Sequence, residues 1–356
     1  MFETNSLPKY YQLKEYLKEM ILTGKIASGE QLPSENSLVQ QFNMSRHTIR
    51  QAMKELELEG WIYRKQGKGT FCAFREKRWT IAVITTYVSD YIFPSIIREI
   101  ENVLSAKGCT LILANTDNNK KKEAQCLKKL LEIDIDGFII EPTKSALENV
   151  NSNYFSELEK KRVPYLMLHA VYPELDPAYI MMDDEMGGYL ATKYLLQLGH
   201  RMIAGIFKSD DIQGVKRQKG FMTALNEYGI KLEPGLLGNY ETEQMYSYPY
   251  QFTCRILEGS PRPTAIVCYN DQIAMQVLHA IRDRGLKVPE DISIVGYDDS
   301  SLAVASEVKL TSIKHPKGEM EYQAARFIID MIEKRVEKPK LIYTPELVVR
   351  SSCRSI

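Results

Sequence analysis

Residues 45–56 read SRHTIRQAMKEL and decide the fold of the N-terminal part of the chain. Ser45 belongs to the residue types that cap helix N-termini. The apolar residues that recur behind it at helical spacing are Ile49, Met53 and Leu56. One face of the predicted helix therefore packs inward, while Arg46, His47 and Arg50 face solvent. Taken alone, this pattern is equally typical of an ordinary surface helix.

The flanking segments favour a more specific interpretation. Residues 61–63 (WIY) and 70–72 (TFC) are β-prone and enclose a turn rich in glycine and basic residues, which predicts a small hairpin. Upstream, an apolar stripe predicts a first helix that Gly24 can end, and Ser34 can cap a second helix. Three helices closed by a hairpin form a winged helix-turn-helix, whose third helix enters the major groove of DNA.

Three motifs resemble the DNA-binding domain of the GntR family of bacterial repressors: residues 32–35 (LPSE), residues 45–50 (SRHTIR) and residues 60–71. The resemblance implies that the chain binds double-stranded operator DNA. It places Lys9 and Tyr10 just before the first helix, where they touch the DNA backbone. The DNA-binding residues that it implies are Lys9, Tyr10, Glu35, Ser45, Arg46, His47, Thr48, Arg50, Gln66, Gly67 and Lys68.

The chemistry of these side chains suggests a division of labour. Arg46 and Arg50 can each form paired hydrogen bonds with guanine, worth about 1–3 kcal/mol of discrimination per pair. His47 and Gln66 suit either base or backbone contacts. Glu35 either accepts a bond from cytosine or orients an arginine, and we favour the orienting role. Other groups suit phosphate oxygens, and such contacts position the domain on DNA without reading the base sequence. These groups are Lys68, the wing amides and the hydroxyls of Ser45 and Thr48.

Composition limits the class of protein. The chain has 356 residues and a formal net charge of zero, yet residues 43–75 hold seven Lys or Arg against three Glu. This local excess is the footprint expected of a DNA-binding surface. The six cysteines form no Cys-x-x-Cys pair and do not cluster with histidine, so we expect no metal, no cofactor and no disulfide framework. Reduced cysteines and the lack of a long apolar run predict a cytoplasmic protein.

The remainder of the chain alternates strand and helix. We expect a winged helix-turn-helix domain at residues 1–72, a linker at residues 73–78 and an effector-binding and dimerisation domain at residues 79–356. Strands buried on both faces are expected at residues 110–114, 137–140, 165–168, 203–207, 265–268 and 292–296. Helices are expected at residues 96–106, 186–198, 273–284 and 319–333. This alternation predicts an α/β fold with two doubly wound parallel sheets, one in each of two lobes.

Polar residues follow nearly every expected strand, where ligands bind in open parallel sheets. Carboxylates, amides and aromatic rings at these ends suit the hydroxyls and apolar faces of a sugar. Residues 198–200 (LGH), 268–274 (CYNDQIA), 288–299 (VPEDISIVGYDD) and 310–315 (LTSIKH) also resemble the effector domain of the LacI/GalR family. That resemblance implies a periplasmic-binding-protein-like fold with three crossovers between lobes. It assigns effector contacts first to Arg217, Asn270 and Asp298, then to Asp183 and His315, where the family usually has glutamine.

A GntR-like head on a LacI-like body is similar to a family of arabinose-responsive repressors. Residues 139–147 (IIEPTKSAL), 205–208, 211–217 and 308–317 carry this similarity. It implies L-arabinose as the effector, although Lys144 and Lys208 would equally suit a sugar phosphate. The complete set of expected effector-binding residues is Tyr91, Phe93, Glu141, Lys144, His169, Asp183, Lys208, Gln213, Arg217, Tyr269, Asn270, Asp298 and His315.

Together these observations predict a transcriptional repressor and not an enzyme. As a homodimer it would bind pseudo-palindromic operators of arabinose utilisation genes and be released when a sugar closes the cleft. An activator, or a repressor that responds to another sugar, a sugar phosphate or a purine, would have the same architecture. Two other classes of protein fit less well. A sugar-acting enzyme would have no role for the winged helix-turn-helix domain, and a transporter-associated binding protein would carry a signal peptide.

Overall fold

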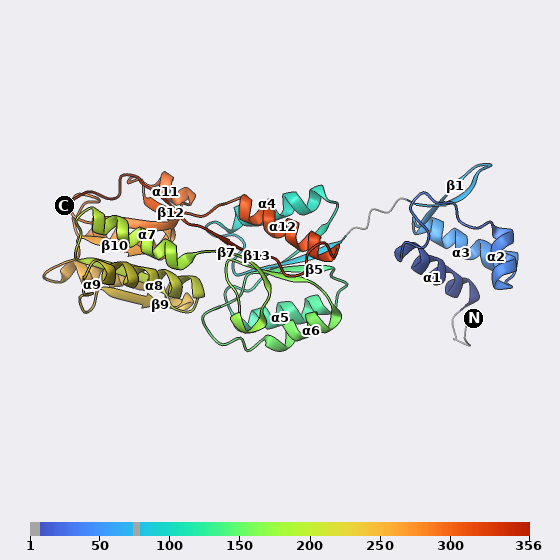
Figure 1. Ribbon diagram of the computed structural model, residues 1–356, viewed down its shortest axis with the longest axis horizontal. Coiled ribbons are helices and arrows are strands. Elements are labelled where there is room, and N and C mark those ends of the chain that lie inside the picture. The colour runs from blue at the N-terminus through green and yellow to red at the C-terminus, as the bar shows by residue number, and fades with distance from the viewer. Residues whose placement is uncertain (1–7, 74–78) are drawn as a thin grey trace. The chain divides into compact units, whose positions relative to one another are not determined.

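The computed structural model describes residues 8–73 and 79–356, and the chain divides into two compact units, Met1–Arg78 and Trp79–Ile356 (Figure 1). Of the expected linker, only Ala73 belongs to the described residues. No helix in the described ranges is long and apolar enough to cross a membrane.

The first unit is a three-helix winged head. Its elements are α1 (Lys9–Leu22), α2 (Glu35–Phe42), α3 (Arg46–Leu58) and the antiparallel hairpin of β1 (Ile62–Lys65) and β2 (Gly69–Cys72). The expected caps are confirmed, because Ser34 Oγ accepts a bond from the Ser37 amide and Ser45 Oγ accepts one from the Thr48 amide. The side chains that form the core between the helices include Leu13, Leu17, Leu38, Ile49, Met53 and Leu56.

One expectation about the first helix was wrong. Lys9 and Tyr10 do not precede α1 but form its first two residues. Pro8 occupies the position before them with a φ of −56°. A proline fixes φ near the helical value and lacks an N–H that would need a partner, so the helix can begin directly after it.

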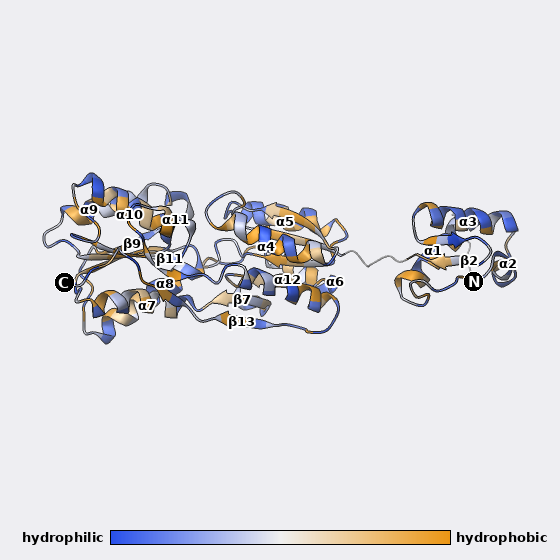
Figure 2. Cartoon of the chain, turned by 90° about the horizontal axis from the view of Figure 1, so that it is seen from above, coloured by the Kyte–Doolittle hydropathy of each residue, from blue (hydrophilic) through white to orange (hydrophobic). Residues whose placement is uncertain are grey.

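The first lobe of the second unit is a doubly wound parallel sheet. Its strands, in order across the sheet, are β13 (Lys340–Tyr343), β7 (Ala178–Met182), β6 (Tyr165–Leu168), β5 (Gly137–Ile140), β3 (Thr80–Thr85) and β4 (Thr110–Asn115). Helices α4 (Phe93–Ala106) and α12 (Glu319–Ile332) share one hydrophobic core, and α5 (Lys120–Leu131) and α6 (Ser152–Lys161) share the other. The strands are largely hydrophobic, as Figure 2 shows.

The second lobe repeats this design. Its strands, in order, are β14 (Glu346–Val348), β12 (Thr311–Lys314), β11 (Ser293–Asp298), β10 (Ala265–Cys268), β8 (Ile203–Lys208) and β9 (Leu237–Tyr240), parallel except for β14. Helices α7 (Asp184–Gln197) and α8 (Ile212–Glu227) cover one face. The other face carries α9 (Tyr248–Glu258), α10 (Asp271–Asp283) and the short α11 (Ser301–Ala305). Two 3₁₀ turns, η1 (Pro173–Leu175) and η2 (Thr242–Gln244), complete the unit.

The chain crosses between the lobes three times, between β7 and α7, between β12 and α12, and between β13 and β14. These crossings lie side by side. The Asp183 amide donates to the Tyr343 carbonyl at 2.9 Å, and Lys314 is in register with Glu346. The three crossovers implied by the sequence are thus present, and the α/β fold of two parallel-sheet lobes is confirmed.

One expected strand differs from its prediction. The segment at residues 110–114 forms β4, but its side chains are exposed or half-buried instead of being buried on both faces. Strand β4 lies at the edge of its sheet, paired only with β3. An apolar run fits the edge and the centre of a parallel sheet equally well, so the sequence pattern did not distinguish them.

Candidate functional site

The recognition helix α3 presents its expected contact residues to solvent. Ser45, Arg46, His47 and Arg50 are exposed, and Thr48 is half-buried. Ser45 Oγ already accepts the Thr48 amide, and the other backbone amides at the N-terminus of a helix suit phosphate oxygens. Of the remaining expected residues, Lys9, Gln66, Gly67 and Lys68 are exposed, and Tyr10 and Glu35 are half-buried.

Glu35 contacts an arginine of the recognition helix. Its Oε2 accepts a bond from Arg50 Nε at 2.9 Å, and its Oε1 lies 3.6 Å from Arg64 Nη2. This is the geometry of the orienting role that we favoured for Glu35. Arg64 lies on β1 within the third motif, but it was not among the expected DNA-binding residues.

The wing is anchored to the segment before α2. The Gln31 side-chain amide donates to the Lys68 carbonyl at 2.9 Å, and the Leu32 amide donates to the Thr70 carbonyl at 2.9 Å. Gly69 has a φ of +114°, and a Cβ built there would lie 2.5 Å from the Gln31 amide nitrogen. The positive φ favours glycine at this position, and the bonds made by Gln31 and Leu32 hold the tip of the wing where Lys68 faces solvent.

A cavity lies between the two lobes of the second unit. It encloses about 690 Å³ of empty space, a volume that includes open solvent at its mouth. Eleven of the thirteen expected effector residues line it: Tyr91, Phe93, Glu141, His169, Lys208, Gln213, Arg217, Tyr269, Asn270, Asp298 and His315. Most of them lie at or just after the carboxyl ends of parallel strands.

Arg217 is the central cation of the cavity. This buried side chain on α8 donates from Nε to Asp184 Oδ1 at 2.8 Å and from Nη1 to the Tyr269 carbonyl at 2.8 Å. Its guanidinium carbon lies 3.5 Å from the ring centre of Tyr297. A Cβ at Gly188 would lie 2.0 Å from the Arg217 carbonyl oxygen, so this glycine allows α7 to pack closely against α8. The result is a guanidinium fixed in one orientation.

Asp298 lies at the end of β11 and contacts the opposite lobe. The Tyr91 hydroxyl donates to Asp298 Oδ2 at 2.8 Å, and Arg217 Nη2 lies 3.8 Å from Oδ1. Asp298, Tyr91 and His169 have positive φ values of 90°, 57° and 67°. Such conformations cost free energy in residues other than glycine and are concentrated at binding sites.

On the first lobe, Glu141 is held by two neighbours. Its Oε2 accepts bonds from the Thr86 amide at 2.8 Å and the Thr86 hydroxyl at 2.5 Å, and its Oε1 lies 3.1 Å from His169 Nδ1. Burial alone would raise the pKa of the Glu141 carboxyl, but His169 and Thr86 hold this pKa below its ordinary value. Conversely, burial opposes charge on His169, but Glu141 raises its pKa. Burial lowers the pKa of His315 well below its ordinary value.

Two expected effector residues lie elsewhere. Lys144 does not line the cavity, because Nζ binds Glu243 at 2.8 and 3.0 Å and lies 3.4 Å from Asp210. Asp183 does not line it either, because its carboxylate caps α7 by accepting a bond from the Met186 amide at 3.0 Å.

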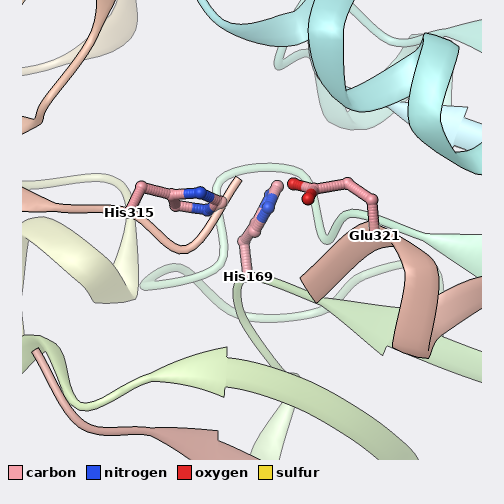
Figure 3. A group of neighbouring side chains, drawn as sticks. All are labelled: His169, His315 and Glu321. Atoms are coloured by element: carbon pink, nitrogen blue, oxygen red, sulfur yellow. The ribbon is translucent and has the colours of Figure 1, made fainter. Parts of the chain in front are cut away.

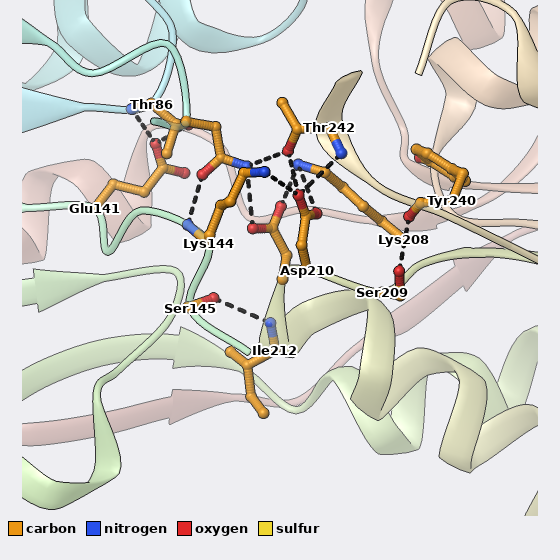
Figure 4. Close-up of polar contacts among 12 residues, drawn as sticks. Thr86, Glu141, Lys144, Ser145, Lys208, Ser209, Asp210, Ile212, Tyr240 and Thr242 are labelled. Atoms are coloured by element: carbon orange, nitrogen blue, oxygen red, sulfur yellow. Dashed lines mark hydrogen bonds and ion pairs between the residues drawn. The ribbon is translucent and has the colours of Figure 1, made fainter. Parts of the chain in front are cut away.

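The residues around Lys144 join the two lobes, as Figure 4 shows. Asn118 Nδ2 donates to Thr242 Oγ1 at 2.7 Å and to Asp211 Oδ1 at 3.3 Å, and Ser145 Oγ accepts a bond from the Ile212 amide at 3.0 Å. We call this set the lobe-bridging network; its members are Asn118, Lys144 and Ser145 from the first lobe and Asp210, Asp211, Ile212, Thr242 and Glu243 from the second.

Beside the network, Lys208 points toward the cavity. Its Nζ donates to Asp211 Oδ2 at 2.6 Å. Burial would lower the pKa of this ammonium group, but the charge of Asp211 raises it above its ordinary value. The buried cation is therefore balanced by a carboxylate of its own lobe.

Several lining residues were missed by the sequence analysis: Thr86, Tyr87, Asp90, Ile92, Asp211, Met245, Tyr246 and Gln272. Thr86 to Ile92 belong to the loop after β3, and the aromatic spacing of that loop was a usable signal. Met245 and Tyr246 follow η2 shortly after the end of β9, a strand that the sequence analysis did not predict, and so carried no such signal.

Comparison with known proteins defines the class. Residues 9–72 match the bacterial regulatory proteins of the gntR family, and residues 192–353 match the periplasmic binding protein-like domain. Among solved structures, a complex of the transcriptional regulator CelR with cellobiose has a TM-score of 0.68 at 25% identity, covering 86% of this chain and 90% of that one. A LacI family regulator from Enterococcus faecium with bound ribose has a TM-score of 0.67 at 28% identity, covering 78% and 99%. The molecule is a bacterial transcriptional regulator with a winged head and a two-lobed effector domain.

The particular family follows from relatives of nearly full length. The arabinose metabolism transcriptional repressor of Halalkalibacterium halodurans is 48% identical over 97% of this chain and 96% of its own. That of Geobacillus stearothermophilus is 46% identical over 99% of both chains. The chain belongs to the family of arabinose metabolism transcriptional repressors, and the expected combination of a GntR-type head with a LacI-type body is confirmed.

Proposed function

We propose that this repressor binds its operator as a homodimer and is released by L-arabinose. The observation that carries the sugar assignment is the charge balance of the cavity. Among the described residues, its lining carboxylates are Asp90, Glu141, Asp211 and Asp298, whereas its lining lysine and arginine residues are Lys208 and Arg217. A cavity with this balance favours a neutral ligand with many hydroxyl groups.

The same balance disfavours a sugar phosphate. Lys208 is already paired with Asp211, and Arg217 is paired with Asp184. Lys144, the other candidate for phosphate binding, is engaged by Glu243. A phosphate dianion would have to displace these carboxylates while lying close to Glu141 and Asp298, which repel it.

The remaining chemistry suits a small sugar ring. Carboxylate and amide groups such as Glu141, Asn270 and Asp298 can bond neighbouring hydroxyls, and the aromatic rings of Phe93 and Tyr269 can pack on apolar ring faces. The names of the two nearly full-length relatives favour arabinose over other sugars of similar size.

The mechanism that we propose is closure of the lobes around the sugar. The cavity walls come from both lobes, so a sugar bound by Glu141 on one side and by Arg217 and Asp298 on the other stabilises the closed arrangement. In a dimer, closure would change the spacing of the two heads on a pseudo-palindromic operator. A coupling of about 1–3 kcal/mol, typical of allosteric proteins, would weaken operator binding roughly 5- to 150-fold.

We also propose that the cavity binds its sugar without converting it. A sugar-cleaving enzyme needs two carboxyl groups poised as acid and base on either side of one bond. Here Glu141 is held by Thr86 and His169, and Asp298 by Tyr91. These contacts fix the carboxylates as hydrogen-bond acceptors.

The test is isothermal titration of the full-length protein with L-arabinose, D-xylose, D-galactose and arabinose 5-phosphate. We expect selective binding of L-arabinose at one site per chain, with no turnover of the sugar. Fluorescence anisotropy with a labelled pseudo-palindromic duplex should then show release on addition of L-arabinose, and sedimentation should show a dimer. Tighter binding of the phosphate ester, or of another sugar, would contradict the assignment of the effector.

A further inference from the structure

Three buried side chains from separate segments meet beside the cavity, as Figure 3 shows. His169 follows β6, His315 follows β12 and Glu321 lies in the first turn of α12. Each is no more than 5% exposed. One possible ligand atom from each side chain lies within 4.8 Å of those of the other two.

Several polar atoms of these three residues have no hydrogen-bond partner among the described residues. They are His169 Nε2, both ring nitrogens of His315 and Glu321 Oε1. Buried polar atoms are nearly always hydrogen-bonded, so several unpartnered atoms in one cluster require a physical explanation. An ion that accepts one lone pair from each of the three side chains would satisfy three of these four atoms, and the second nitrogen of His315 would then carry the ring N–H.

In His169 and Glu321, the other polar atom of the side chain is held by a contact within the protein. His169 Nδ1 lies 3.1 Å from Glu141 Oε1, and Glu321 Oε2 accepts a bond from the Gly318 amide at 2.6 Å. A histidine that donates one ring N–H to a carboxylate presents its other nitrogen as a lone pair, which is the usual arrangement of histidine ligands to metals. The contacts of Glu141 and Gly318 therefore orient the free atoms.

We propose that His169, His315 and Glu321 bind one divalent transition-metal ion of the zinc class. Two imidazole nitrogens and one carboxylate oxygen are a ligand set that zinc accepts, and sites with three protein ligands keep a fourth position open. Bonds of about 2.0–2.2 Å in tetrahedral geometry would bring the ligand atoms to roughly 3.4 Å apart. The present separations, of up to 4.8 Å, are longer than this, so the three side chains would draw closer together on binding the ion.

The fourth position faces the cavity. His169 and His315 line the cavity, whereas Glu321 lies behind them on α12. An ion held by these three ligands thus has its open side toward the space that the effector would occupy, where a water or a ligand hydroxyl completes the coordination. The ion would also connect the first lobe with the crossing between β12 and α12.

The test is titration of the full-length, chelator-treated protein with Co²⁺, followed through its visible ligand-field absorption, with Zn²⁺ as the competing ion. We expect one ion per chain. Glu321→Gln and His315→Gln should each weaken binding at least 100-fold, and Glu141→Gln, which removes an orienting contact, roughly 10- to 100-fold. His279→Gln is the matched control, because His279 is an exposed histidine on α10 and should leave the affinity unchanged.

Absence of saturable binding by the unaltered protein would overturn the proposal. Binding that Glu321→Gln and His315→Gln both leave unchanged would place the ion elsewhere and overturn it as well. His315→Gln preserves a polar side chain of similar length, so it decides the question if Glu321→Gln does not fold. Since no sugar is present, the outcome is independent of the proposed effector.

Discussion

Replacing Lys144 by methionine should weaken binding of the effector although this side chain lies outside the cavity. Lys144 Nζ, on the first lobe, contacts Glu243 at 2.8 Å and lies 3.4 Å from Asp210, both on the second lobe. These contacts exist only while the lobes are close together. Methionine keeps the length of the side chain and removes its charge.

The magnitude follows from the exposure of the two acidic partners. The Glu243 side chain is 63% exposed, so this pair should contribute about 0.2–1 kcal/mol. Asp210 is fully buried but keeps two bonds from Thr242, so we assign the loss of Lys144 a further cost of about 1 kcal/mol. A total of about 1–2 kcal/mol corresponds to roughly 5- to 30-fold. If the lobes of the sugar-free protein are mostly apart, only the closed fraction of the molecules binds the sugar tightly. A substitution that lowers this closed fraction therefore lowers the apparent affinity for the sugar by the same factor.

The assay is isothermal titration of L-arabinose into the unaltered protein, Lys144→Met and Lys122→Met. Lys122 is the matched control, because it pairs with Asp117 inside the first lobe and its replacement removes the same charge. We expect the control to bind as the unaltered protein does. Equal affinities of Lys144→Met and Lys122→Met would refute the reasoning, because the lobe-bridging network would then not stabilise the closed arrangement.

Three further predictions concern the head, the cavity and the core. In anisotropy titrations with DNA duplexes, Arg50→Ala should relax specificity at one base pair. Lys68→Ala should instead weaken binding to all duplexes and reduce by about one the slope of log affinity against log salt concentration. Equal, sequence-independent losses of affinity in both variants would contradict this division of labour. Arg217→Met should abolish the sugar response and, by leaving the buried Asp184 carboxylate without its cation, lower the free energy of unfolding by about 3–5 kcal/mol in urea titrations. Burial raises the pKa of Asp271 to about 7, so the folded protein retains this proton while the unfolded chain loses it. The contribution of Asp271 to the free energy of unfolding should therefore fall as pH rises from about 4 to about 7. The melting temperature of the Asp271→Asn variant should depend less on pH over that range than that of the unaltered protein. An unchanged pH dependence would argue against the raised pKa of Asp271.

The sequence was most informative where structure is determined locally. The winged head depends on caps and spacing within short segments, and Ser34 and Ser45 cap the helices as expected. The first helix was misplaced only because Pro8 was not recognised as its start. The edge position of β4 depends on sheet order, which an apolar run does not encode.

The cavity was predictable in large part because parallel strands bring their carboxyl ends to one edge of a sheet. The exceptions depend on geometry that spacing does not reveal. Lys144 has a φ of +42° and lies within a turn, and Asp183 caps a helix. The cluster of His169, His315 and Glu321 has no motif at all, since its members come from distant segments, and for this reason the sequence indicated no metal.

The three adjacent crossings restrict how the lobes can move. The segment after β7 is bonded to the end of β13, and the segment after β12 lies beside the start of β14, so the connections form one narrow strap. Two lobes joined by three adjacent segments resist sliding and twisting relative to one another, but they can bend about these segments as about a hinge. Opening about this hinge would then be described largely by one angle, and we expect a ligand in the cavity or a substitution in the lobe-bridging network to change its preferred value. One engineered covalent link across the mouth of the cavity would accordingly fix the whole effector domain in one state.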